Sequence, residues 1–334
     1  MSLADRRPTL SVVVPFFNSA ATLNACVRAL VAAADDDTEI ILADDGSTDG
    51  GATTLDRPVD RRVQVVRSEE NIGRGPIRNL GAAVATGEIL VFVDSDVVVH
   101  PDALHQITRA FTEDPSRTAV LGSYDEAPTD PGVTSRYRNL LHHHTHHTHG
   151  PTATHFWTGL GAVRRSAFEE VGGLDVGRWA RNMEDVEFGH RIVDGGGRID
   201  LLPSIEGTHL KRFTVRSMVR IDLFNRAIPW AMLMVDRGLR VDPIVTAWPQ
   251  RLSALGLGTI VAGLLARALV PGDDSMGILA TILLGIVGSF VGGMIGALFS
   301  SDRNVLDFNT SGLILSIVGA VIALLVYRKV SSRA

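Results

Sequence analysis

Apolar runs alternate with polar, helix-forming stretches through the first hundred residues of the chain. Each apolar run is short, is rich in Val and Ile, and ends in a turn that carries Gly, Ser, Asn or Asp. The strand-like segments are 10–18, 38–47, 63–73 and 88–97, and the helical ones are 18–34 and 77–86. Strands that alternate with helices at this spacing predict βαβ units, and therefore an α/β fold with a mostly parallel central sheet.

The pattern changes after about residue 250, where charged residues nearly vanish. Residues 276–299 carry no charged side chain and are long enough to cross the ~30 Å hydrocarbon layer of a bilayer. Residues 311–327 form a second, shorter candidate, and 255–270 form a third that Arg267 interrupts. A buried core helix would explain one such run. Three in succession predict α-helical transmembrane segments, and glycines at four-residue spacing in 276–299 favour close helix packing and self-association. These are Gly288, Gly292 and Gly296.

Length, cysteine count and net charge exclude several classes of protein. The 334 residues suffice for one large domain or two ordinary ones, and the single Cys26 excludes an intrachain disulfide framework. The formal net charge of −5 provides no overall attraction to nucleic acid. The N-terminal residues lead directly into a strand and do not resemble a signal peptide, so we expect the N-terminal part to stay in the cytoplasm.

Acidic residues stand where the predicted strands end. Asp44 and Asp45 follow the second strand, and Asp94 and Asp96 follow the fourth. Ligands of open α/β sheets bind outside the carboxyl ends of the strands. Two carboxylates separated by one residue on an extended segment point to the same side, so Asp94 and Asp96 can share Mg²⁺ or Mn²⁺. Taken alone, this D-x-D pattern is more typical of a strand-end turn with solvated acids.

Four motifs occur in order over residues 10–212: "VVVPFFNSAATL", "ILADDGSTDG", "NIGRGPIRNLGAAVATGEILVFVDSDV" and "MEDVEFGHRI". Together they resemble the family 2 inverting glycosyltransferases of the A-type fold. The resemblance implies a Rossmann-like nucleotide-diphospho-sugar transferase domain, a UDP- or GDP-sugar donor, and inversion at the transferred hexose.

The resemblance also implies a donor site at the first three motifs. Phe17 would lie beside the base, although ordinary core packing also explains a phenylalanine here. Asp45 would accept a hydrogen bond from a base N–H, and arginines would flank the diphosphate. The implied donor-binding residues are Pro15, Phe17, Asn18, Asp45, Arg74, Arg78, Asp94 and Ser95.

Asp94-Ser95-Asp96 becomes the metal motif under this resemblance. Asp96 is the expected direct ligand of Mg²⁺ or Mn²⁺, with Asp94 closer to the ribose or to a metal-bound water. His209 is a candidate third ligand, since Val98 cannot serve, while a purely structural histidine is the alternative.

The fourth motif carries Glu184 and Asp185 at the expected start of a helix. In the family, the Asp of this pair removes the proton of the acceptor hydroxyl, and Asp185 takes that role here. Acids also favour helix N-termini for purely structural reasons. If the acceptor is a lipid phosphate, which is already an anion, Asp185 orients it rather than deprotonates it. Trp157, shortly before the motif, is either an acceptor wall or a core residue.

Two stretches lie outside these motifs. The tract "HHHTHHTH" over 142–149 matches no zinc signature, and we expect a solvated loop there, with acceptor contact and pH sensing as alternatives. Residues 213–228, if helical, place Phe213, Ile221, Phe224 and Ile228 on one stripe, with Arg212, Arg216 and Arg220 on its neighbour. This arrangement favours an interfacial helix at an anionic bilayer, while packing on the catalytic domain is the alternative.

Residues 255–330 resemble the small glycine-rich membrane proteins called transglycosylase-associated or stress-response membrane proteins. That family implies topology rather than function. Three spans would place Arg328, Lys329 and Arg333 across the membrane from the catalytic domain, against the positive-inside tendency, whereas two spans would satisfy it.

The sequence therefore predicts a catalytic domain over 1–212, interfacial helices over 213–252 and a transmembrane domain over 253–330. The expected protein is a multi-pass inner-membrane glycosyltransferase with its catalytic domain at the cytoplasmic face and a polyprenyl phosphate-like acceptor. A polysaccharide or glycolipid acceptor, an inactive sugar-nucleotide-binding module and a nucleotidyltransferase are the alternatives. The sequence leaves the donor, the sugar, the acceptor and the oligomeric state open.

Overall fold

The computed structural model describes residues 9–51, 53, 55, 60–148, 150–180, 182–236, 320–322 and 324–325. The chain divides into two units, Met1–Ile244 and Val245–Ala334. The predicted spans 255–270 and 276–299, and most of 311–327, lie outside the described residues. Among the residues that are described, no helix has the length and apolar character needed to cross a membrane.

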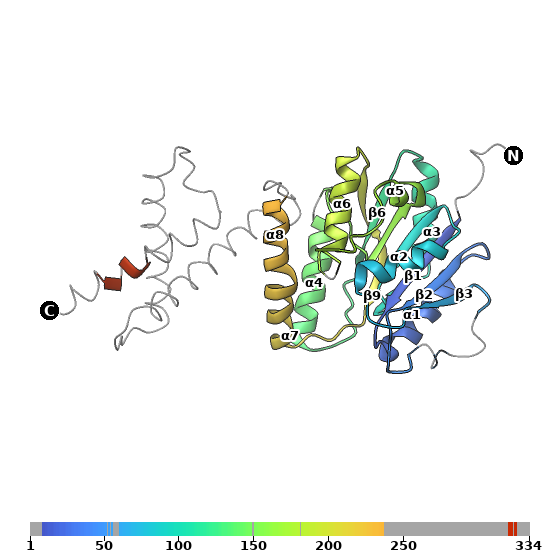
Figure 1. Cartoon of the computed structure of the whole chain (residues 1–334). Helices are drawn as coiled ribbons and strands as arrows, with labels where there is room; N and C mark the ends of the chain where they lie inside the picture. Colours follow the sequence, from blue (N-terminus) through green and yellow to red (C-terminus); the bar gives the residue numbers. More distant parts are fainter. Residues whose placement is uncertain are drawn as a thin grey trace. The chain divides into compact units, whose positions relative to one another are not determined.

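The first unit is built on one mixed sheet of nine described strands (Figure 1). Its order is β3-β2-β1-β4-β8-β6-β9-β5, with β7 paired to β9. Six of these strands share one direction, and β5, β7 and β8 oppose them. The mostly parallel sheet is therefore confirmed, although the sequence did not reveal the antiparallel β8 at its centre. The strands are β1 (Leu10–Phe16), β2 (Glu39–Asp44), β3 (Val63–Arg67), β4 (Ile89–Val93), β5 (Val97–Val99), β6 (Ala119–Tyr124), β7 (Thr152–Ala153), β8 (Leu160–Arg164) and β9 (Ile199–His209).

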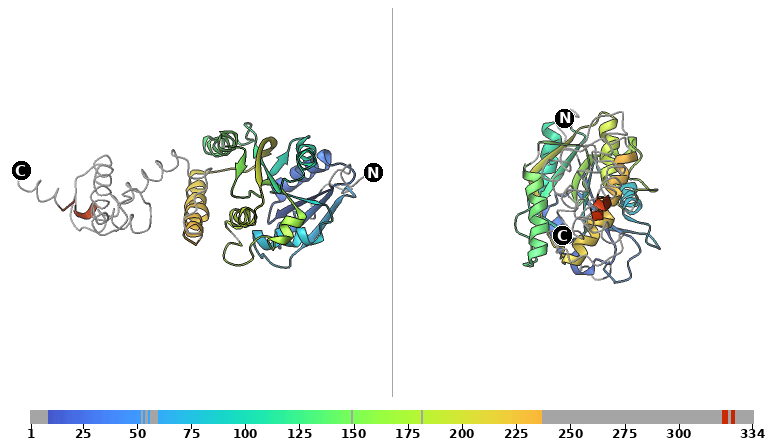
Figure 2. Two further views of the ribbon diagram at one scale, coloured as in Figure 1. Left: turned by 90° about the horizontal axis from the view of Figure 1, so that it is seen from above. Right: turned by 90° about the vertical axis from the view of Figure 1, so that its left-hand side faces the viewer.

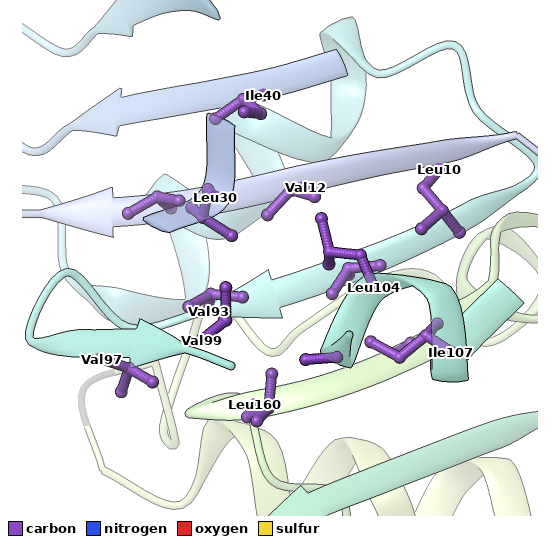
Figure 3. Close-up of a cluster of buried hydrophobic side chains, with 14 of the residues drawn as sticks. Leu10, Val12, Leu30, Ile40, Val93, Val97, Val99, Leu104, Ile107 and Leu160 are labelled. Carbon is purple, nitrogen blue, oxygen red and sulfur yellow. The ribbon is translucent and has the colours of Figure 1, made fainter. Parts of the chain in front are cut away.

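Helices cover both faces of this sheet (Figure 2). Because side chains alternate along a strand, Val12 packs with α1 and α3 on one face, while Val13 packs with α2 and α6 on the other. Figure 3 shows the first of these clusters, in which Leu30 of α1 and Leu104 of α3 lie against strand side chains. The helical segments are α1 (Ala20–Ala33), α2 (Arg74–Val84), α3 (Ala103–Glu113), α4 (Val133–Thr148), α5 (Arg165–Glu170), α6 (Glu184–Asp194), α7 (Val215–Arg220), the π-helical η2 (Ile221–Ala227) and α8 (Ile228–Asp236).

The register of the parallel strands brings the acidic strand ends together. Phe16 of β1 pairs with Asp44 of β2, which in turn pairs with Arg67 of β3. Val13 pairs with Phe92, so the end of β4 and the turn after it reach the same edge. Asp45 and the acidic turn after β4 therefore meet at one edge of the sheet, as parallel pairing requires.

The histidine tract is helical over its described residues 142–148, so the expected loop is wrong there. Helix α4 spans Val133–Thr148, and Ser135, Asn139 and His146 on it are buried. Ser135 hydrogen bonds to the backbone of Phe213, and Nδ1 of His146 lies 2.9 Å from the carbonyl oxygen of Gly122 in β6. The buried face of this helix is polar rather than apolar, which is why hydrophobic periodicity did not predict it.

The predicted apolar stripe after residue 212 is only partly right. Phe213 is buried and Ile221 faces the cavity described below, whereas Phe224 and Ile228 are exposed. The π-helical segment inserts one extra residue, which shifts every later side chain around the axis. The stripe that reaches solvent has spacings of four, five, four and four: Val215, Val219, Phe224, Ile228 and Met232.

Candidate active site

A cavity of about 650 Å³ opens where the carboxyl ends of β1, β2 and β4 meet α2, α6 and the end of β9. It collects eleven of the twelve predicted site residues, although they are spread over almost two hundred positions of the chain. These are Pro15, Phe17, Asp45, Arg74, Arg78, Asp94, Ser95, Asp96, Glu184, Asp185 and His209.

Asn18, the twelfth, does not line the cavity but holds its first wall in place. Its backbone has a positive φ of 50°, and its side-chain oxygen accepts hydrogen bonds from the N–H groups of Thr48 and Asp49, at 2.8 and 3.2 Å. This joins the turn after β1 to the turn after β2. Phe17, next to it, is 46% exposed at the cavity, which excludes the core-packing alternative.

Asp45 is buried and organises the loop that leads into α2. One carboxylate oxygen accepts the N–H of Ile72 at 2.7 Å, and the other accepts the N–H of Gly73 at 3.1 Å. Gly73 has φ 103°, a conformation that favours glycine. The bonds set the start of α2, and Arg74, its first residue, lines the cavity.

Arg78 forms a buried bridge between the end of strand β4 and the start of helix α6. Its guanidinium donates to Asp94 Oδ1 at 2.7 Å and to Glu184 Oε1 at 2.8 Å. The side chains of Arg78 and Glu184 are each 4% exposed, while that of Asp94 is 36% exposed. The arginine therefore fixes the positions of two cavity carboxylates and neutralises part of their charge.

Asp96 faces His209, which is the last residue of β9. His209 Nε2 lies 3.5 Å from Asp96 Oδ2, and Lys211 Nζ lies 3.9 Å from the same oxygen. Burial alone would raise the pKa of Asp96, but its contact with His209 and the charges of His209 and Lys211 hold that pKa below its usual value. The His209 ring stacks on Tyr124 with its centroid 4.2 Å away. Its Nδ1 lies 2.7 Å from the buried Asn139 Oδ1, which can only accept, so Nδ1 carries a proton and Nε2 is the nitrogen that faces Asp96.

Glu184 and Asp185 open helix α6, directly after the left-handed Met183 with φ 77°. A non-glycine residue in this region costs energy and is common at functional sites. Burial and the charge of Asp185 raise the pKa of Glu184 to about 7, despite the opposing charge of Arg78. Asp185 is only half-buried; its Oδ1 accepts the N–H of Val186 at 2.9 Å, and Thr158 Oγ1 lies 3.5 Å from its Oδ2. Glu184 is therefore held in the wall, and Asp185 is the acid presented to the cavity.

An aromatic group forms the wall next to α4. Trp157 lines the cavity and packs against Tyr124 and His142, with ring centroids 4.9 and 4.5 Å away. Trp157 is therefore packed on one side and faces the cavity on the other. Sequence reasoning missed further lining residues, and four of them lie on α4 and β6, outside the four motifs: Tyr124, Arg138, Asn139 and His142.

Two protein families match separate parts of the chain. Residues 11–172 match the model of glycosyl transferase family 2, and residues 282–332 match that of transglycosylase associated protein. The chain joins a family 2 glycosyltransferase domain to a transglycosylase-associated region. Both resemblances seen in the sequence are confirmed.

Two curated relatives each match one part of the chain. Glycosyltransferase GlyG of Streptococcus pneumoniae is 35% identical over 117 residues, which are 34% of this chain and 38% of that protein. The chain thus spans well under half of that relative. UPF0410 protein YeaQ of Escherichia coli K12 is 44% identical over 73 residues, which are 22% of this chain and 88% of YeaQ.

The family 2 domain also shares its fold with a solved enzyme. The mannosyltransferase PcManGT from Pyrobaculum calidifontis, solved in complex with GDP-Man and Mn²⁺, aligns with a TM-score of 0.55 at 22% identity. The alignment covers 96% of this chain and 88% of that chain. The A-type α/β fold predicted from the sequence is therefore confirmed.

Proposed function

We propose that this protein is a metal-dependent, inverting hexosyltransferase that moves a sugar from a UDP- or GDP-sugar to a lipid-linked acceptor at the membrane. The observation that carries the proposal is the convergence of Asp94, Asp96, His209 and Asp185 on one cavity of the family 2 domain. PcManGT, which shares the fold, was solved with a nucleotide-sugar and Mn²⁺.

The residues around Asp96 fit a divalent cation. Asp96 offers a carboxylate held in its charged form, and His209 offers Nε2, whose direction Asn139 sets and which would become a ligand when a cation displaces its proton. A histidine that donates its other ring N–H to an oxygen is the usual outer-shell arrangement of metal-binding histidines. Oxygen and imidazole ligands together suit Mn²⁺, and Mg²⁺ is the alternative. When bound, such an ion stabilises the negative charge that builds up on a departing nucleoside diphosphate.

Of the remaining cavity residues, some would bind the donor and one would act on the acceptor. Phe17 presents an exposed ring for a nucleobase, and Arg74 at the first turn of α2 provides a cation for phosphate oxygens. Asp185 is the half-buried acid that takes the proton of an acceptor hydroxyl, or orients an acceptor phosphate, as the sugar is transferred. Transfer in a single displacement inverts the anomeric carbon.

A lipid-linked acceptor is favoured by the segment from α7 to α8. Its exposed apolar stripe lies beside exposed arginines, a combination suited to an anionic bilayer surface. The same segment lines the cavity through Ile221, Asn225 and Arg226, so a bilayer-bound acceptor is close to the site. The match to the transglycosylase-associated family supports a membrane-bound C-terminal region, and we place the catalytic domain at the cytoplasmic face as part of this proposal. The exposed arginines are Arg212, Arg216 and Arg220.

A screen of sugar nucleotides tests this proposal. Full-length protein is heated with each candidate donor and Mn²⁺, and we expect one nucleotide class to raise the melting temperature. Asp96→Asn should remove that shift, whereas Asp185→Asn should keep it and lose transfer of labelled sugar to polyprenyl phosphate.

Two outcomes would replace the proposal. Donor binding without turnover by the wild type would favour the inactive sugar-nucleotide-binding module. Transfer to a soluble polysaccharide but not to polyprenyl phosphate would replace the lipid acceptor with a glycan.

A further inference from the structure

Three side chains outside the catalytic cavity converge between α4 and β9. His143 and His147 lie one helical turn apart on α4, and Glu206 lies opposite them on β9. One potential ligand atom from each lies within 4.8 Å of the other two. None of the three lines the catalytic cavity. The helical form of the histidine tract, which the sequence did not show, creates this cluster.

Hydrogen bonds to backbone carbonyls orient both imidazoles. His143 Nδ1 lies 2.8 Å from the carbonyl oxygen of Tyr124, and His147 Nδ1 lies 2.9 Å from the carbonyl oxygen of His143. A carbonyl oxygen only accepts, so each Nδ1 carries a proton, and in the neutral ring the lone pair is on Nε2. An N–H donated to a backbone carbonyl is the arrangement that orients metal-binding histidines.

The position of Glu206 calls for a cation. Its Oε1 lies 3.5 Å from His147 Nε2 and 3.9 Å from His143 Nδ1. At His147, the lone pair of a neutral ring and the Glu206 carboxylate repel each other unless a proton or a metal ion lies between them. His143 approaches Glu206 through the edge that carries Nδ1, which donates to Tyr124. His100 adds support on the other side, with its Nδ1 3.8 Å from Glu206 Oε2 and its Nε2 3.0 Å from Asp125 Oδ2. Glu206 is thus held among partners that keep it facing the two histidines.

We propose that His143, His147 and Glu206 bind one divalent transition-metal ion of the Zn²⁺ class, separate from the cation of the catalytic cavity. Two imidazoles and one carboxylate form a ligand set that zinc uses, and a solvent molecule completes the tetrahedron. The set has two imidazoles where the catalytic site has one, and a larger share of imidazole favours zinc-like ions over Mg²⁺. The three side chains are 21–33% exposed, so the ion can enter from solvent.

The ion would join two walls of the catalytic cavity from outside. Helix α4 carries Asn139 and His142 on its cavity side, and β9 ends in His209. A metal bridge between α4 and Glu206 therefore restrains the Asn139–His209 contact without touching the substrate. The site does not depend on which donor or acceptor the enzyme uses.

Zn²⁺ titration of metal-free, full-length protein without an affinity tag tests the proposal. The titration is carried out in an Asp96→Asn background, so that the catalytic carboxylate pair is not intact, and a chromophoric chelator competes for the ion. We expect one saturable site. His147→Ala and Glu206→Gln should weaken binding by about 100-fold or more, in line with the loss of a direct ligand.

His144→Ala is the matched control, because it removes an exposed histidine of the same helix and leaves the same number of histidines as His147→Ala. It should bind Zn²⁺ as the parent does, and Co²⁺ in the parent should give the strong visible absorption of a tetrahedral site. Circular dichroism of the metal-free variants checks that α4 still forms. Equal affinity of the His147→Ala and His144→Ala variants would overturn the proposal, as would a parent with no saturable site. The cluster would then be held by protons alone.

Discussion

Removal of the buried Arg78 bridge should destabilise the family 2 domain in a way that depends on pH. In Arg78→Met, a side chain of similar length loses both charge-assisted hydrogen bonds, at 2.7 and 2.8 Å. The loss leaves Glu184 buried with Asp185 beside it and no cation in contact. Breaking a buried pair typically costs about 3–5 kcal/mol. The bond to Asp94 adds less than the bond to Glu184, because Asp94 is 36% exposed and water replaces part of it.

The expected fall in melting temperature is on the order of 10 °C, since 1 kcal/mol corresponds to about 2–4 °C in a domain of this size. The fall should be larger at pH 8 than at pH 5.5, because Glu184 has a pKa of about 7 and is protonated at the lower pH. Adding Glu184→Gln to Arg78→Met should recover part of the loss at pH 8, since it removes the unpaired charge.

Thermal unfolding followed by tryptophan fluorescence measures all three proteins at both pH values. A loss in Arg78→Met that is the same at both pH values, and that Glu184→Gln does not reduce, would refute this account of the bridge.

Three other predictions follow from the site. Asn139→Leu removes the acceptor that orients His209. It should raise the Mn²⁺ concentration for half-maximal activity by about 10–100-fold, with little change in the circular dichroism spectrum. An unchanged Mn²⁺ dependence would show that Asn139 does not support the metal site. Glu184→Gln should change the pH dependence of stability. The folded pKa of about 7 lies above the ordinary glutamate value of 4.5, so wild-type stability that is fully present below pH 4.5 is lost as the pH rises through 7. The variant should lack this decline in its melting curves. Phe17 is already exposed, so Phe17→Ala should leave the melting temperature nearly unchanged. It should weaken nucleotide binding by about tenfold, because stacking of the base on the ring is lost. Equal nucleotide affinity of variant and wild type in a calorimetric titration would place the base elsewhere.

The sequence predicted the sheet and the acidic edge because these follow from local pattern. Apolar runs that end in acids place Asp45, Asp94 and Asp96 at the same edge once parallel pairing is assumed. The family resemblance added Asp185, whose helix begins where the motif indicated.

The wall formed by α4 could not be predicted in the same way. Its buried face consists of Ser135, Asn139 and His146, so the helix lacks the apolar period that sequence reasoning relies on. The contact of Asn139 with His209 joins positions seventy residues apart and leaves no local signal. The π-helical insertion after α7 also has no signature in the residue pattern, and it moved the exposed stripe away from Phe213 and Ile221.

The release of nucleoside diphosphate from a sugar nucleotide tests the central claim most directly. Full-length protein is incubated with donor, acceptor and Mn²⁺, and the products are separated by ion-exchange chromatography. We expect nucleoside diphosphate to form only with the metal, and both Asp96→Asn and Asp185→Asn to slow its release by at least about a thousandfold while the fold is retained. Release that continues unchanged in Asp96→Asn, or release of inorganic diphosphate instead, would contradict the account.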